Sequence, residues 1–305
     1  MEKTCVVVGS INVDFFIGVE ALPKPNETLM GQSLTTALGG KGLNQAVACA
    51  RSGLRTHMVA ATGDDTLGQQ ARDFLVERGV EISCLVSVKK VATGVANIVV
   101  ARGGDNMIVV SPGANACLAP EQVDAAEDLI SKADVLVVQL ETPMPTVQRA
   151  LEIARRHAVM TVLNPAPVDV RARSLFPLVD LITPNETELM KLTGITELDD
   201  DNLIAGLQAL IDLGASRAVV TLGDKGSATL LDGKLMRVPP FQVLAVDATG
   251  AGDVFNGALV TRLVHGDDLL KAMHYASAAS AISVTKPSAD SAPSEEDVRN
   301  FLASH

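Results

Sequence analysis

The sequence predicts an α/β fold, in which helices cover both faces of a central, mostly parallel β-sheet and a small antiparallel β-sheet forms a lid. Short runs of β-branched residues alternate with longer stretches of helical periodicity from residue 5 to residue 222. This alternation is typical of parallel strands joined by crossover helices. The composition agrees, because 47% apolar and 20% charged residues are typical of a globular chain. We expect a single domain over residues 1–305.

The predicted elements follow one another in a regular order. Residues 5–9, with the sequence CVVVG, form an apolar run that predicts a buried strand. Further strands are expected at residues 56–61, 135–140, 159–163, 181–183 and 218–222. Helices are expected at residues 42–51, 67–78, 121–131, 147–156, 186–192, 203–213, 251–264, 269–284 and 295–302.

Two segments interrupt the alternation. Residues 15–38 have no helical period and contain two prolines. Residues 93–110 contain two β runs, 95–100 and 107–110, joined by a Gly-Gly-Asp turn that is typical of a hairpin. We predict that the two segments form a small antiparallel sheet, a lid over the carboxyl ends of the parallel strands. The alternative is an edge hairpin without a function.

Composition argues against several classes of function. The net charge of −11 opposes binding to the phosphate backbone of DNA or RNA, and the chain has no Trp and one Tyr with which to stack on bases. No apolar run is long enough to span a bilayer, and the first residues lack the pattern of a secretory signal. The four cysteines form no CxxC pair. We therefore expect a cytoplasmic protein that binds neither nucleic acid nor membranes.

The most informative motif is the segment VDATGAGDVFNG at residues 246–257. Gly250 and Gly252 would let a phosphate approach the backbone where a helix begins. Asp253 then lies in the first turn of that helix, where a carboxylate can accept the proton of a hydroxyl that attacks the phosphate. The alternative is that Asp253 only complements the helix dipole. The motif is neither the dinucleotide fingerprint nor a P-loop.

A second glycine cluster, LGGKGLNQ at residues 38–45, also opens a predicted helix. Lys41 and Asn44 offer donors to hydroxyl groups, although a tight turn with a solvated lysine would have the same sequence. Asn12 and Asp14 follow the first strand, at the end of a parallel sheet where ligands bind. They could clamp a vicinal diol, or they could only form a turn.

Three more segments follow predicted strands. Glu141 lies directly after the predicted strand at residues 135–140. Asn185 and Glu188 have the spacing of a capping box, in which the helix cap alone would explain both residues. Residues 221–226 (TLGDKG) are typical of a turn.

These motifs, in this order, resemble the ribokinase family of sugar kinases, within the wider PfkB carbohydrate kinases. The resemblance is carried by residues 39–44, 185–188 and 247–253 and extends from about residue 6 to residue 301. It implies that the chain transfers phosphate from ATP, with Mg²⁺, to the primary hydroxyl of a pentose. D-ribose, giving ribose 5-phosphate, is the first expectation, and deoxyribose, another sugar or a nucleoside is the alternative. A regulator that binds sugar or nucleotide without catalysis is a third possibility, but it would have little need of the base.

The resemblance implies a role for each matching residue. Asp253 matches the general base, and Gly250, Ala251 and Gly252 match an amide anion hole. The positions that match contacts to sugar hydroxyls are Asn12, Asp14, Gly40, Lys41, Asn44, Glu141 and Asp253. The positions that match nucleotide contacts are Asn185, Glu188, Thr221, Gly223, Gly226, Gly252 and Ser277, with Glu188 also holding the waters of Mg²⁺.

The resemblance also implies a potassium site beside the anion hole. Asp247 and Thr249 match two of its ligand positions. The other side departs from the pattern, because Ser288 stands where a glycine is expected and Ala292 where a serine is expected. Backbone carbonyls of Ser283, Lys286 and Ser288 could still bind the ion, so we expect an altered or weakened site. We also expect a homodimer through the lid, since pairing would remove exposed edge strands.

Overall fold

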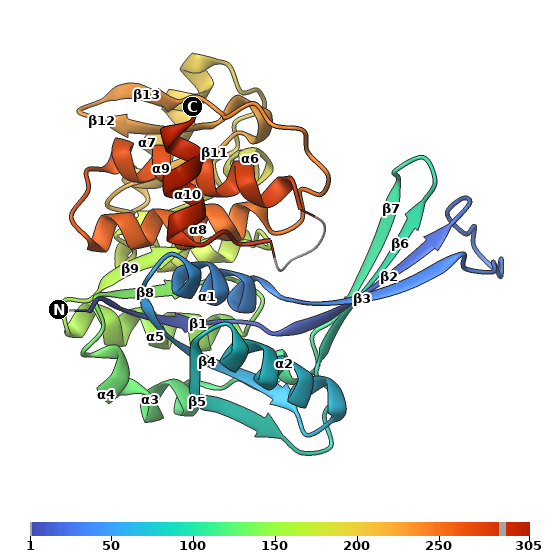
Figure 1. Cartoon of the computed structure of the whole chain (residues 1–305). Helices are drawn as coiled ribbons and strands as arrows, with labels where there is room; N and C mark the ends of the chain where they lie inside the picture. Colours follow the sequence, from blue (N-terminus) through green and yellow to red (C-terminus); the bar gives the residue numbers. More distant parts are fainter. Residues whose placement is uncertain (1, 287–290) are drawn as a thin grey trace.

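The central sheet consists of six parallel strands in the order β10-β9-β8-β1-β4-β5 (Figure 1). The computed structural model describes residues 2–286 and 291–305. The strands are β1 (Thr4–Val8), β4 (Arg55–Gly63), β5 (Val80–Val88), β8 (Val135–Val138), β9 (Met160–Leu163) and β10 (Leu181–Ile182). All neighbouring pairs are parallel, which confirms the predicted fold class.

The sheet continues beyond β10 into an antiparallel edge. Two parallel bridges, Ile182 to Ala218 and Asn185 to Thr221, join β10 to β11 (Val219–Thr221). The next strands, β12 (Ser227–Leu231) and β13 (Lys234–Val238), pair antiparallel with β11 and with each other. The local sequence pattern did not predict β5, β12 or β13. They lie at or near the sheet's edges and mix polar with apolar residues, so they lack the continuous apolar run of a buried parallel strand.

Helices cover both faces of the sheet. In β1, Cys5 and Val7 face one core, whereas Val6 and Val8 face the other, because successive side chains of a strand point to opposite sides. The first core is covered by α1 (Lys41–Arg51), α2 (Thr66–Glu77), α8 (Ala251–Val264), α9 (Leu269–Val284) and α10 (Glu295–Ala303). The second is covered by α3 (Pro120–Ala125), α4 (Glu127–Ile130), α5 (Met144–Arg156), α6 (Glu186–Thr193) and α7 (Asp200–Asp212), with 3-10 turns at Gly113–Cys117 and Val170–Leu178.

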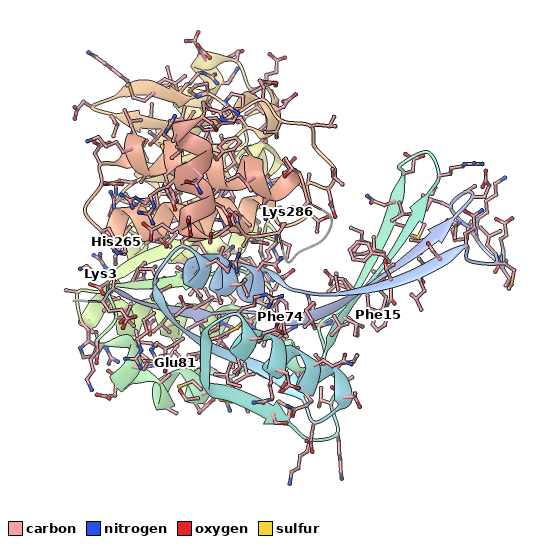
Figure 2. All side chains as sticks on the ribbon, viewed as in Figure 1. Lys3, Phe15, Phe74, Glu81, His265 and Lys286 are labelled. Atoms are coloured by element: carbon pink, nitrogen blue, oxygen red, sulfur yellow. The ribbon has the colours of Figure 1, made fainter. Side chains whose placement is uncertain are left out.

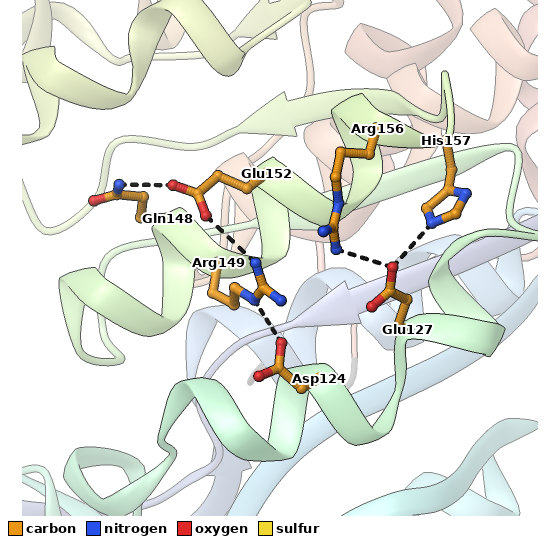
Figure 3. A network of polar contacts seen from close by, with 7 residues as sticks. All are labelled: Asp124, Glu127, Gln148, Arg149, Glu152, Arg156 and His157. Carbon is orange, nitrogen blue, oxygen red and sulfur yellow. Dashed lines mark hydrogen bonds and ion pairs between the residues drawn. The ribbon is translucent and has the colours of Figure 1, made fainter.

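The helix predicted at residues 121–131 is divided into α3 and α4 at Ala126. A surface network of polar contacts joins this pair to α5 (Figure 3). Arg149 pairs with Asp124 at 2.5 Å, and Arg156 pairs with Glu127 at 2.9 Å. Such exposed ion pairs contribute at most about 1 kcal/mol each, so the buried apolar residues beneath them hold these helices in place.

The four remaining strands form an arm that projects from the α/β body (Figure 1). Figure 2 shows the side chain of Phe15 on this arm. The strands are β2 (Asn12–Val19), β3 (Ser33–Gly39), β6 (Gly94–Ala101) and β7 (Asn106–Ser111), in the order β3-β2-β6-β7.

The pairing within the arm is antiparallel at its two sides and parallel at its centre. As predicted, β2–β3 and β6–β7 are antiparallel, and the backbone of Ala101 and Asp105 closes the β6–β7 turn. The central pair, β2 and β6, is parallel, which the expectation of a wholly antiparallel sheet missed. Both strands run outward from the body, one after β1 and the other after β5.

None of the helices in residues 2–286 and 291–305 combines the length and the apolar character that crossing a bilayer requires.

Candidate active site

Asp253 lies in the first turn of α8, where the helix begins at a glycine. Gly250 caps this helix with φ of 76°, a left-handed conformation that suits glycine. The Asp253 side chain is 5% exposed, and two amides of α1 hold its carboxylate. Asn44 Nδ2 donates to Oδ2 at 3.0 Å, and Gln45 Nε2 donates to Oδ1 at 2.8 Å. The two glycine motifs of the sequence therefore meet at one carboxylate.

The close packing of α1 on α8 makes this meeting possible. At Gly257, an added Cβ would lie 2.4 Å from Cβ of Ala48, which is too close for two real atoms. Glycine at this position lets the two helix backbones approach each other. The side chains of Asn44 and Gln45 can then reach across to the first turn of α8.

The start of α8 can bind an anion. The first amides of a helix have no partner within the helix and carry the positive end of its dipole. Gly252 is exposed and has open space around its Cα, so a phosphate could approach its backbone closely. The amide of Ala251 donates to the carbonyl of Ala248 at 3.2 Å, which closes the turn before the helix. Gly250, Ala251 and Gly252 thus lie beside Asp253 at the positive end of α8, with the amide of Ala251 already bonded to Ala248.

Lys41, at the start of α1, lies among three carboxylates. Its backbone amide donates to Glu141 Oε2 at 2.9 Å, and the same oxygen accepts a 2.5 Å hydrogen bond from Ser10. Burial lowers the pKa of Lys41, but the charges of Asp253, Glu141 and Glu188 outweigh this effect, so its pKa is raised. A lysine that stays charged among three acids can balance the negative charge that a phosphate would add.

The first residues of β2, Asn12 and Asp14, form another part of the site. Asn12 Oδ1 accepts a hydrogen bond of 2.8 Å from Asn115 Nδ2, and Asn115 Oδ1 accepts one of 2.9 Å from the amide of Ile11. Burial and, to a smaller extent, the charge of Glu141 raise the pKa of Asp14 to about 6. Within residues 2–286 and 291–305 no ion pair joins Asp14 to a positive side chain, so this buried acid suits a ligand with hydroxyl groups.

Two glycines let the end of β3 approach these residues. An added Cβ at Gly39 would lie 2.4 Å from Asp14 Oδ2, and one at Gly40 would lie 2.8 Å from the backbone nitrogen of Asn12. Gly40 also has φ of 91°, which L side chains rarely adopt. The paired glycines thus bring the end of β3 against the start of β2.

Asn185 and Glu188 form the capping box that their spacing predicts. Asn185 Oδ1 accepts from the amide of Glu188, and Glu188 Oε2 accepts from the amide of Asn185, both at 2.9 Å. Burial raises the pKa of Glu188. Both residues therefore cap α6, as their spacing predicts. The Glu188 carboxylate is also close enough to Lys41 for their charges to interact, so capping does not exclude a second role for it.

The expected nucleotide positions lie in part beside this cap. Thr221 bridges to Asn185, and its amide donates to Pro184 at 3.0 Å. Gly223 begins a 3-10 turn (Gly223–Lys225) and Gly226 follows it, with φ of 57° and 85°. Ser277 is buried in α9, and no hydrogen bond among the described residues joins its side chain to the other positions.

Some of the expected potassium ligands lie close together. The amide of Thr249 donates to Asp247 Oδ1 at 2.8 Å, and the amide of Asp247 donates to the carbonyl of Val284 at 3.1 Å. This contact brings the end of α9 beside the turn that precedes α8. The carbonyl of Ser283 accepts from the amide of Lys286 at 3.1 Å, and Ser288 lies outside the described residues.

The structure adds polar residues for which no role was predicted. Gln45 lies within the second glycine cluster, and Ser10 lies between the first predicted strand and Asn12. The buried side chains of Gln139 and Asn164 reach Gln45 from the ends of strands. Asn115 follows the arm's hairpin and carried no local signal, because its contacts to β2 join residues about a hundred positions apart.

Comparisons with known proteins identify the family. Residues 2–297 match the pfkB family of carbohydrate kinases. The chain is 40% identical over 303 residues to a ribokinase of Haemophilus influenzae, covering 99% of both chains. It is 35% identical to a deoxyribokinase of Salmonella typhi, covering 97% of this chain and 98% of the relative. The solved structure of Arabidopsis thaliana ribokinase with ribose and ATP superposes with a TM-score of 0.92 at 30% identity, covering 99% of each chain. The chain therefore belongs to the PfkB family of carbohydrate kinases, which are phosphotransferases with an alcohol acceptor.

Proposed function

We propose that the protein transfers the γ-phosphoryl group of ATP to the primary hydroxyl of D-ribose, giving ribose 5-phosphate and ADP. The observation that carries this proposal is the position of Asp253, a buried carboxylate held by two amides beside the N-terminus of α8. A base and an anion site next to each other are what phosphoryl transfer to a hydroxyl needs. The relative from Haemophilus influenzae and the Arabidopsis structure with ribose and ATP support ribose as the acceptor.

The sugar would lie between the start of β2 and the start of α1. Asp14 and Glu141 would accept hydrogen bonds from its hydroxyls, and Lys41 and Asn44 would donate to them. Asn12 and the backbone of Gly40 would complete the contacts. Asp253 would take the proton of the attacking hydroxyl.

The charge that develops on the transferred group would be stabilised by the start of α8. The amides of Gly250 and Gly252 would bind it at the start of the helix, and the amide of Ala251 would exchange its hydrogen bond to Ala248 for one to the phosphoryl group. Lys41 is close enough to Asp253 for their charges to interact, and the surrounding acids raise its pKa. Its positive charge would therefore add to the stabilisation of the transferred group. Positioning and charge stabilisation, rather than covalent help, would therefore carry most of the rate enhancement.

The nucleotide would bind beside the cap of α6. Its contacts would come from Asn185, Thr221, Gly223, Gly226, Gly252 and Ser277. Glu188 would hold Mg²⁺ through water, and the ion would neutralise charge on the triphosphate. The donor set fits, because Mg²⁺ prefers carboxylate oxygens and keeps several waters. No cluster of three or more His, Cys, Asp or Glu side chains within residues 2–286 and 291–305 could cage a metal, so the phosphates would supply further ligands.

A potassium ion beside the anion site is also part of the proposal. Asp247 and Thr249 adjoin the end of α9 through the bond from Asp247 to Val284. Carbonyls of Ser283, Lys286 and Ser288 would add ligands. The hydroxyl of Ser291 is buried and has no hydrogen-bond partner among the described residues, so a polar group is available near the altered segment. The ion would hold the turn before α8 in shape.

We further propose that the arm is a lid through which two copies of the chain pair. The outer strands of the arm, β3 and β7, are its two edges. Large apolar side chains are exposed on them, with Leu34 at 64%, Ile108 at 55% and Val109 at 59%. An exposed apolar edge favours association, and pairing would cover it. The four cysteines are free thiols, as suits the reducing cytoplasm in which we expect this enzyme to act.

A substrate panel tests the proposed acceptor. Wild-type protein is assayed with ATP and Mg²⁺ against ribose, 2-deoxyribose, other pentoses, fructose and adenosine, with the Asp253→Asn variant as the background. Ribose should give the highest kcat/KM, because a site that binds each hydroxyl rejects an analogue that leaves its partner unpaired. A clear preference for deoxyribose or adenosine would replace ribose as the substrate, and no turnover with any acceptor would overturn the proposed function.

A further inference from the structure

We propose that Gln45 is a positioning residue that fixes the Asp253 carboxylate, so that Oδ2, the oxygen beside Asn44, receives the proton of the acceptor. This inference rests on the proposed function, in which Asp253 is the base. Gln45 itself would not touch the sugar or the nucleotide, because its side chain is completely buried.

The side chain of Gln45 makes three hydrogen bonds. Its Nε2 donates to Asp253 Oδ1 at 2.8 Å and to Asn164 Oδ1 at 3.1 Å. Its Oε1 accepts from Gln139 Nε2 at 2.7 Å. Both N–H groups are therefore used, and the amide cannot rotate without leaving buried polar groups unsatisfied, which is unfavourable.

The direction of these hydrogen bonds is set by a backbone carbonyl. The carbonyl of Thr183 can only accept, so the group of Asn164 that faces it at 3.0 Å must be Nδ2. The Oδ1 of Asn164 then faces Gln45, which must present Nε2 in return. The second hydrogen on this nitrogen points to Asp253. Residue 45 is thus required to be a donor toward the carboxylate, and a residue of the same shape that accepts there would break the chain of bonds.

The same contacts fasten the base to the central sheet. Gln139 follows β8, Asn164 follows β9 and Thr183 follows β10, so the three supports come from neighbouring strand ends. Asp253 belongs to a helix rather than to that sheet, and Gln45 links the two. A rigid support matters because a displacement of about 1 Å at a reacting group can lower a rate by about a hundredfold.

The two oxygens of Asp253 have different surroundings. Oδ1 is bound by the fully buried Gln45, whereas Oδ2 is bound by Asn44, which is only partly buried. A carboxylate oxygen has two lone-pair sites, so Oδ2 keeps one after binding Asn44. Gln45 therefore holds the inner oxygen and leaves the outer oxygen directed to the substrate side.

Two variants of Gln45 test the inference. Gln45→Met keeps the size and removes the hydrogen bonds, and kcat should fall about tenfold or more while KM for ATP stays close to wild type. Gln45→Glu puts an acceptor against Asp253 at neutral and higher pH, and kcat should fall further. As the pH falls from about 8 to about 6, the new carboxyl becomes protonated and can donate as the amide did. The ratio of variant to wild-type kcat should then rise, which a merely structural role would not produce.

A matched control separates positioning from loss of stability. Thr261 is buried in the same helix α8 and donates to the carbonyl of Gly257 at 2.8 Å, two turns beyond Asp253. Thr261→Val should lower the Tm but leave kcat unchanged. If Gln45→Met does not fold, Gln139→Met removes only the bond to Gln45 Oε1 and should lower kcat in the same direction by a smaller factor.

The outcomes distinguish this inference from the proposed function. Wild-type kcat in both Gln45 variants, or an equal loss in Thr261→Val, would overturn the positioning role. In the case where Gln45→Met does not fold, wild-type kcat in Gln139→Met would do so. If Asp253→Asn retained wild-type turnover, the base itself would be wrong, and the proposed mechanism would fail with it. If Asp253→Asn lost turnover while both Gln45 variants behaved as wild type, Asp253 would remain the proposed base and only the positioning role of Gln45 would be rejected.

Discussion

Asp14 on β2 and Glu141 after β8 lie close enough for the charge of one to act on the other. Together with burial, which is the larger cause, this raises the pKa of Asp14 to about 6. Two acids that approach each other without a bound ligand cost free energy when both are ionised. A sugar that donates hydroxyl hydrogens to both would lower that cost. We therefore expect the pair to lower the stability of the ligand-free protein and to raise its affinity for the sugar.

The first prediction concerns sugar binding by Asp14. In the wild type, KM for ribose should rise as the pH falls below about 6, because the protonated carboxyl loses an acceptor for the sugar. Asp14→Asn should raise KM for ribose far more than KM for ATP, and it should remove this pH dependence. Equal effects on the two KM values would show that Asp14 only shapes the turn.

The second prediction concerns the effect of Asp14 on stability. Its pKa is about 6 in the folded protein, against the ordinary value of 3.8. Between these values the folded state holds the proton more tightly than the unfolded state, so the free energy of unfolding decreases as the pH rises through this window. Above pH 6 the ionised carboxylate costs on the order of 3 kcal/mol. Asp14→Asn should therefore raise the Tm relative to wild type at about pH 8 but not at about pH 4, and a constant difference would contradict this.

The third prediction concerns the base. Asp253→Asn should reduce kcat about a hundredfold or more, because the amide cannot accept the proton of the acceptor. ATP binding, measured by calorimetry, should stay close to wild type, since the amides at the start of α8 are unchanged. Near-normal kcat would leave Asp253 with only its contribution at the helix N-terminus.

The fourth prediction separates the two roles of Glu188. Glu188→Gln keeps a side-chain acceptor for the amide of Asn185 but loses the oxygen that accepts from Asn185 Nδ2 at 2.9 Å, so the cap of α6 should persist with a modest fall in Tm. The Mg²⁺ concentration for half-maximal activity should rise, because a neutral amide holds the waters of a cation less well. Glu186→Gln removes the same charge from the same helical turn and is the control. A similar Mg²⁺ requirement in both variants would assign Glu188 to the cap alone.

The fifth prediction concerns potassium. KCl, titrated at constant ionic strength, should activate the wild type with a saturable response, and Asp247→Ala should require much more KCl. Asp247 is expected to dominate, since it supplies the only formal negative charge among the ligands we assign to this site. A flat wild-type response would show that the altered segment near Ser288 has abolished the site.

The lid can be tested with a matched pair of exposed valines. Val109 on β7 is 59% exposed, and Val76 on α2, outside the arm, is 58% exposed. Val109→Glu should convert a dimer into a monomer in analytical ultracentrifugation, because a charge would be buried on pairing. Val76→Glu should leave the dimer intact. A monomeric wild type, or a dimer that persists in Val109→Glu, would contradict pairing through the arm.

Much of this protein could be predicted from local sequence. Hydrophobic periodicity and turn residues act over a few positions, so the buried strand at Thr4–Val8, the hairpin after Ala101 and the helix that starts at Gly250 follow from short segments. The glycine motifs also identified Asn44 and Asp253 as candidates. Strands with mixed polarity, such as β5 and β13, were missed, because their burial depends on the elements that cover them.

The tertiary structure decided which side chains meet. Gln45 and Asp253 are 208 positions apart, and their hydrogen bond exists because α1 packs closely on α8 at Gly257. Asn115 and Asn12 are 103 positions apart, and β2 pairs in parallel with β6 because both strands leave the same body in the same direction. The raised pKa of Asp14 likewise depends on burial and on Glu141. Sequence determines the local elements and their chemical groups, whereas distances, burial and hydrogen-bond direction arise only when remote segments pack together.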